Sequence, residues 1–278
     1  MPGSRRQWLG RQLWGWCSLA ALGSGCALVI PPVLSRMEVL RLSGRCSGRA
    51  PTLVVMLPGA YSRPPEFVEA GFPQALRAVG AAVDICIADS HVGYYIDRSI
   101  LRRLREEIVL PARAAGYRQI WLVGISLGGF GALGYAVRHG RDIDGVLALA
   151  PYLGPRRLTQ EIAQAGGALA WRAAAHAVSG AALDAASTAK GLDGGAPDEV
   201  DRELWLAYAG PDSSRPALPV HLGYGLDDRF ADANRRFGEL LPPARVATAP
   251  GGHDWPVWRD LWQAWLAQGL LATTCEPA

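Results

Sequence analysis

The chain of 278 residues is half hydrophobic and carries a net charge of +3, from 28 basic and 25 acidic residues. This length and hydrophobic content suffice for one large core and exclude disorder over most of the chain. The charges are balanced and form no long run of either sign, which excludes the basic surface of a nucleic-acid-binding protein.

The first 30 residues have the pattern of an export or anchoring segment. Three arginines within the first 11 residues precede an apolar stretch, Leu13–Ile30, that ends at two prolines. Residues 22–26, with the sequence LGSGC, resemble a bacterial lipobox, in which the cysteine is diacylated after cleavage. We therefore expect an exported periplasmic or cell-envelope protein, held at a membrane surface by lipid on Cys26. A cleaved signal without lipid and an uncleaved anchor remain alternatives, because the stretch is long enough for a tilted membrane span.

From about Val39 the chain alternates short apolar runs with longer amphipathic stretches. The short runs predict six buried strands: Thr52–Leu57, Val83–Ala88, Gln119–Val123, Gly145–Ala150, Pro219–Tyr224 and Ala244–Ala249. The longer stretches predict helices over Pro65–Val79, Ile96–Ala115 and Leu127–Arg138. This alternation indicates an α/β fold, in which helices cover both faces of a mostly parallel sheet.

Residues 154–216 break this alternation. They are rich in alanine and glycine, and they contain no convincing strand. Helical spacing recurs in three pieces: Leu158–Ala165, Leu169–Val178 and Glu199–Tyr208. We interpret the segment as a helical cap inserted into a single domain over residues 31–278, and we expect it to govern substrate selection.

The five cysteines indicate neither a metal site nor a dense disulfide framework. They show no CxxC spacing, and no histidine lies at a zinc-ligand offset. Cys86 lies in an apolar run and is expected to be a buried thiol. Cys46 and Cys275 lie near the two ends of the chain and could pair in an oxidising compartment. No metal is therefore implied.

Residues 124–128, with the sequence GISLG, have the GxSxG pattern of a nucleophilic serine. In so glycine-rich a chain the pattern alone is weak, and an ordinary helix-capping serine is the alternative. Its context decides, because it lies between a predicted strand and a predicted helix. A nucleophile elbow is a strained turn of this kind, with small residues two positions to either side. We therefore expect Ser126 at the carboxyl edge of the sheet.

A serine nucleophile needs a histidine base that is held by a carboxylate. Of the five histidines, His253 is favoured because it follows a predicted strand and the flexible turn 250–252. The acid should lie between serine and histidine in the chain, after another strand, and both Asp227 and Asp228 fit. Asp228 is favoured because it comes three residues after the glycine that ends the strand.

Acyl transfer also needs backbone amides for the oxyanion. The amide of Leu127, directly after the serine, is one candidate. The second should come from the loop after the first core strand, where Gly59 allows the chain to turn its amides toward the site. Ala60 is the expected donor and Tyr61 the alternative.

Together these segments resemble the α/β-hydrolase superfamily, over roughly Pro51 to Leu271. The resemblance rests on the elbow GISLGG, the loops LPGAY and GLDDRF, and GGHDWPVW, which is similar to the ending of esterase-D-like carboxylesterases. It implies an eight-stranded, mostly parallel sheet and hydrolysis of a small acyl ester without a cofactor. Pro58 departs from the histidine that many members carry. The superfamily also hosts thioesterases, peptidases and acyltransferases, and an anchored binding protein on an inactive scaffold is the non-enzyme alternative.

Overall fold

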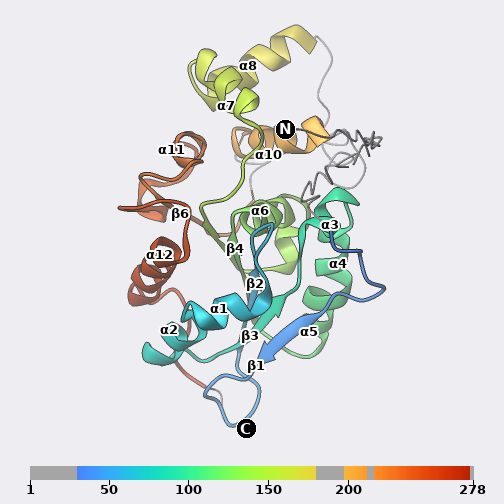
Figure 1. Cartoon of the computed structure of the whole chain (residues 1–278), viewed down its shortest axis with the longest axis vertical. Coiled ribbons are helices and arrows are strands. Elements are labelled where there is room, and N and C mark those ends of the chain that lie inside the picture. Colours follow the sequence, from blue (N-terminus) through green and yellow to red (C-terminus); the bar gives the residue numbers. More distant parts are fainter. Residues whose placement is uncertain (1–29, 180–196, 212–215, 276–278) are drawn as a thin grey trace, which may run out of the picture. The chain divides into compact units, whose positions relative to one another are not determined.

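The computed structural model describes residues 30–179, 197–211 and 216–275. Seven strands form one sheet in the order β1-β3-β2-β4-β5-β6-β7 (Figure 1). Their bounds are Val39–Leu42, Thr52–Leu57, Val83–Ala88, Gln119–Ile125, Gly145–Leu149, Val220–Gly225 and Val246–Ala249, for β1 to β7. Only β1 is antiparallel to its neighbour, and the other pairs are parallel. The mostly parallel α/β sheet predicted from the sequence is confirmed.

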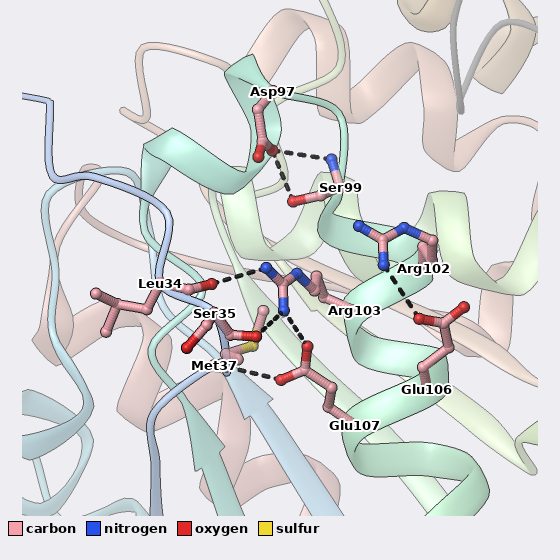
Figure 2. A network of polar contacts seen from close by, with 9 residues as sticks. All are labelled: Leu34, Ser35, Met37, Asp97, Ser99, Arg102, Arg103, Glu106 and Glu107. Atoms are coloured by element: carbon pink, nitrogen blue, oxygen red, sulfur yellow. Dashed lines mark hydrogen bonds and ion pairs between the residues drawn. The ribbon is translucent and has the colours of Figure 1, made fainter.

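The described residues contain seven strands, not the eight that the resemblance implied. The segment before β1 starts with two prolines, which cannot donate ladder hydrogen bonds. The Arg103 guanidinium instead donates to the carbonyls of Leu34 and Ser35, at 2.7 Å each. The Met37 amide donates to the Glu107 carboxylate at 2.7 Å (Figure 2). These bonds fix the segment to a helix, so it does not extend the sheet.

Helices cover both faces of the sheet. On β6, Gly223 lies against Trp265 of α12 (Trp255–Ala267), while Leu222 lies against Gly238 of α11 (Ala231–Gly238). Successive residues of a strand point to opposite faces, so α11 and α12 lie on opposite sides. Helix α12 also packs on α2 (Phe72–Ala78), and α6 (Leu127–His139) packs on β4 and β5. The remaining helices before β4 are α1 (Pro64–Glu69), α3 (Val92–Ile96), α4 (Ile100–Arg103), the π-helical η1 (Leu104–Val109) and α5 (Leu110–Ala114).

Two predicted helices are interrupted in the structure. The stretch predicted as Pro65–Val79 forms α1 and α2, because Gly71 between them has a left-handed φ of 85°. The stretch predicted as Ile96–Ala115 starts only at Ile100, since Arg98 has a φ of 61°. Farther along it passes through the π-helical turn before Pro111, which has no amide to donate to the preceding turn.

The segment between β5 and β6 contains α7 (Arg156–Gln164), α8 (Ala168–Ser179) and α10 (Pro197–Tyr208), where helical pieces were predicted. It shares the core of the domain. The indole of Trp205 is fully buried, donates to the Leu153 carbonyl at 2.8 Å and contacts the ring of Phe237. Removing the whole segment would therefore disturb folding as well as any substrate site.

Cys46 and Cys275 form a disulfide that closes a sequence separation of 229 residues. It ties the loop after β1 to the C-terminal tail, where Arg45 also bonds the Thr273 carbonyl. Cys86 is a buried free thiol, as predicted. Burial raises the pKa of Cys86 to about 11, so this thiol stays protonated at neutral pH.

Replacing Cys46 with serine should lower the free energy of unfolding by about 2–5 kcal/mol, because the cross-link restricts the unfolded chain. Urea unfolding of Cys46→Ser, Cys275→Ser and the double variant measures the effect. All three variants should have the same free energy of unfolding, and adding a reductant should lower that of the wild-type protein only. Equal stability of the wild-type and double-variant proteins would show that the bond contributes nothing.

Residues 1–29 lie outside the described residues, and with them the predicted lipidation site Cys26. Within the part that the structure describes, no helix combines the length and hydropathy needed to span a membrane.

Candidate active site

The register of the sheet brings three loops to one edge. Ile125 at the end of β4 pairs with Leu149 of β5, which pairs with Gly223 of β6. Gly225 at the end of β6 pairs with Ala249 of β7. These pairs are parallel, so the residues that follow β4, β6 and β7 emerge at the same carboxyl edge. Those loops carry Ser126, Asp228 and His253.

Ser126 occupies a strained turn between β4 and α6. Its φ of 53° and ψ of −114° are unusual for a residue with a side chain. Three backbone hydrogen bonds hold it: its amide donates to the Leu149 carbonyl at 2.9 Å, and its carbonyl accepts from Phe130 at 3.1 Å and Tyr152 at 3.0 Å. The conformation is that of a nucleophile elbow.

The glycines of the motif are required by close backbone contacts. A Cβ atom on Gly124 would lie 2.2 Å from the Gly128 carbonyl oxygen. A Cβ atom on Gly128 would lie 2.1 Å from the Leu57 carbonyl oxygen. Neither neighbour is a movable side chain, so the turn at Ser126 forms only with glycine at both positions.

Asp228 and His253 form a buried pair. The Nδ1 atom of His253 lies 2.8 Å from Oδ2 of Asp228, whose side chain has no exposed surface. The other carboxylate oxygen accepts from the Phe230 amide at 2.7 Å. An ionised carboxylate only accepts, so Nδ1–H donates and Nε2 is the ring nitrogen that can take a proton. Asp227 is exposed.

Two aromatic rings fix the plane of the His253 ring. The Phe230 ring lies 5.1 Å from it and the Trp258 ring 5.0 Å, both nearly perpendicular to the imidazole. Trp258 belongs to α12, which begins after Asp254; the Asp254 carboxylate accepts from the Val257 amide at 3.3 Å. The histidine is thus held by a carboxylate and by two rings.

The loop after β2 lies beside the serine. A Cβ atom on Gly59 would lie 3.5 Å from Cβ of Ser126. The Ser62 amide donates to the Gly59 carbonyl at 3.2 Å and closes a turn, and no backbone acceptor for the Ala60 amide is found within the described residues. Leu127 starts α6, and first-turn amides have no acceptor within their own helix. Like the predicted amides of Leu127 and Ala60, the amide of the alternative donor Tyr61 has no backbone acceptor among the described residues, so Ala60 and Tyr61 both stay candidates for the second donor.

The other described histidine side chains have structural roles. His91 accepts from the Gly93 amide at 3.1 Å and caps α3. His139 packs against the ring of Tyr135. His221 lies inside β6, and burial lowers its pKa, with the nearby charge of Arg245 acting in the same direction. The side chain of His176 lies outside the described residues. Among the side chains that are described, no cluster of three or more His, Cys, Asp or Glu could hold a metal ion.

No family model matches the sequence, and no curated protein matches it. Solved structures do match. An S-formylglutathione hydrolase from Staphylococcus aureus gives a TM-score of 0.58 at 12% identity, over 84% of this chain and 92% of that one. A fluorophosphonate-binding serine hydrolase of the same organism gives 0.55 at 12% identity, over 84% and 98%. A monoacylglycerol lipase from Paleococcus ferrophilus gives 0.52 at 15% identity, over 86% and 100%.

The chain has the α/β-hydrolase fold. At these identities the likeness establishes the fold alone, and it confirms the fold that the sequence motifs implied.

In this α/β-hydrolase fold one positioning residue was missed by sequence reasoning. Asn234, the only asparagine of the chain, is fully buried in α11. Its amide donates to the Phe230 carbonyl at 2.9 Å and to the Pro151 carbonyl at 3.3 Å. It therefore links residues 226–230 after β6, the acid loop that carries Asp228, to the loop after β5. In the sequence it is marked only by its isolated occurrence, which does not indicate a role.

Proposed function

We propose that the protein is a serine hydrolase that cleaves carboxylic esters, or thioesters, through an acyl-enzyme on Ser126. The observation that carries this proposal is the buried Asp228–His253 pair at the sheet edge that also holds the strained Ser126. Esterases among the structures of similar fold support it at the level of the fold.

In the proposed reaction, Nε2 of His253 takes the proton of Ser126 Oγ as the oxygen attacks the acyl carbonyl. Asp228 stabilises the imidazolium that forms and keeps the proton on Nδ1. The amides of Leu127 and Ala60 donate to the oxyanion, and such donors contribute about 10²–10³ each in rate. His253 then protonates the leaving alcohol, and water, activated by the same histidine, releases the acid.

The test is the hydrolysis of p-nitrophenyl acetate, with product analysis in the presence and absence of added glycerol. We expect an initial burst of p-nitrophenol followed by release of free acetate. Acetylglycerol as the main product would instead indicate an acyltransferase of the same fold. No turnover with any ester would favour a binding protein on an inactive scaffold.

The mature protein is proposed to act outside the cytoplasm, held at a membrane surface by lipid on Cys26. The Cys46–Cys275 disulfide supports an oxidising compartment. The segment that follows the N-terminal stretch is fixed to the domain through Arg103 and Glu107 (Figure 2).

Mass spectrometry of the N-terminus, after expression in a host with the lipoprotein pathway, tests this location. We expect a diacylglyceryl group on Cys26, because two or more acyl chains give stable anchoring and a single chain does not. An N-terminus intact from Met1 or Pro2 would indicate an uncleaved anchor. Cleavage at another residue without lipid would indicate an exported protein without a lipid anchor.

A further inference from the structure

A cavity of about 340 Å³ lies directly beside the elbow. It is lined by residues of α3, α4, α6 and α10, together with Arg98 between α3 and α4 and Tyr152 after β5. Most of its walls are apolar, with side chains that include Ile100, Leu101, Leu127, Phe130, Tyr152 and Val200. The side chains of Ser126, Asp228 and His253 are not among its lining residues, so the proposed reaction alone does not account for the cavity.

Two residues of the cavity wall are directly linked to Ser126. Leu127 lines it and is the next residue in the chain, and Tyr152 lines it and donates its amide to the Ser126 carbonyl at 3.0 Å. The Tyr152 ring makes an edge-to-face contact with the ring of Phe130, which also lines the cavity. It makes a second edge-to-face contact with the ring of Phe230 in the acid loop. The wall therefore includes one residue that follows Ser126 in the chain and one that is hydrogen-bonded to it.

The position of His253 decides which part of an ester enters. The histidine must protonate the leaving alcohol, so the alcohol lies on the His253 side of the serine. The described walls of the cavity include no residue from the acid loop 226–230 or the histidine loop 250–254. The described walls thus come from other elements than the loops that hold Asp228 and His253, which favours the acyl group over the alcohol as the occupant.

Resting on the proposed acyl-enzyme, we propose that this cavity is the acyl-binding site and that the preferred substrates are esters of medium-chain apolar acids. A cavity of about 150 Å³ holds benzene, so this one holds roughly a dozen carbon atoms at most. Each buried methylene contributes about fourfold, equivalent to about 0.8 kcal/mol. The ratio kcat/KM should therefore rise by up to about fourfold per carbon from acetyl esters upward, and level off once the acyl chain approaches a dozen carbons.

This assignment changes the role of the inserted segment. Of its described residues, Val200 and Asp201 of α10 line the cavity, while most of the wall comes from α3, α4 and α6. Acyl-length selection is therefore shared with the main body of the domain. Point variants in the wall test it without removing the buried Trp205.

The experiment compares p-nitrophenyl acetate and octanoate in Val200→Trp and Val92→Trp, which fill the cavity from α10 and from α3. Each should lower the octanoate-to-acetate ratio of kcat/KM at least about tenfold, since several methylenes lose their place. Acetate hydrolysis is the reference within each variant, so that a change common to both esters cancels in the ratio. Leu110→Trp on α5, a partly exposed residue outside the cavity, is the matched control and should leave the ratio unchanged.

The two variants change different helices of the wall, so if one of them misfolds the other still tests the assignment. An unchanged octanoate-to-acetate ratio in both variants, with acetate still hydrolysed, would overturn the acyl-site assignment and leave the serine hydrolase standing. If the wild-type protein hydrolyses neither ester, the proposed function itself fails, and the acyl site with it.

Discussion

Replacing Ser126 with alanine should lower the hydrolysis of p-nitrophenyl acetate by at least about 10³-fold, and His253→Ala should have a similar effect. The two side chains act as one unit, because the hydroxyl is a nucleophile only while the imidazole takes its proton. For the same reason, the double variant should be no slower than either single variant. Initial rates at saturating and limiting substrate measure these effects.

Stability measurements separate this catalytic loss from misfolding. Alanine keeps the Cβ atom of Ser126 at the strained φ of 53°, so Ser126→Ala should unfold at nearly the wild-type temperature. Ser126→Gly should be equally inactive yet more stable by about 1 kcal/mol, because glycine adopts this conformation with less strain. Substantial activity in a folded Ser126→Ala protein would end the assignment of this serine as nucleophile.

Asp228→Asn should lower the rate by about 10³- to 10⁴-fold, and Asp227→Asn by less than about threefold. At position 228 an asparagine can still accept from the Phe230 amide, but it turns an NH₂ group toward Nδ1 of His253. The histidine proton is then forced onto Nε2, which can no longer act as a base. Asp227 is exposed and serves as the matched control one residue away. Rates for the two variants in parallel decide between them, and the opposite ranking would transfer the role to Asp227.

The elbow could be predicted from the sequence because its strand–turn–helix pattern is local. Gly124 meets the backbone of Gly128 four residues on, so that requirement is local as well, whereas glycine at 128 is required by the Leu57 carbonyl on β2. The core strands could be predicted for the same reason, because a short run of apolar residues in the sequence indicates a buried strand. The choice between Asp227 and Asp228 is less local. It depends on which carboxylate accepts a hydrogen bond from the Phe230 amide and also contacts His253, 25 residues farther along the chain.

Features that depend on distant partners could not be predicted. Asn234 bonds a carbonyl 83 residues away, and its isolated occurrence in the sequence gives no sign of that partner. The short strand β1 is defined by its pairing with β3, while its four residues alone have little signal. The cavity arises only when α3, α4, α6 and α10 are packed around the elbow.

The most direct test of the central claim is fluorophosphonate labelling followed by peptide mass spectrometry. The probe forms a covalent bond with an activated serine, so the wild-type protein should acquire one adduct per chain, on Ser126. His253→Ala should label far more slowly, and Ser126→Ala should not label at all. An adduct on a different serine, or no adduct on the folded wild-type protein, would contradict the account.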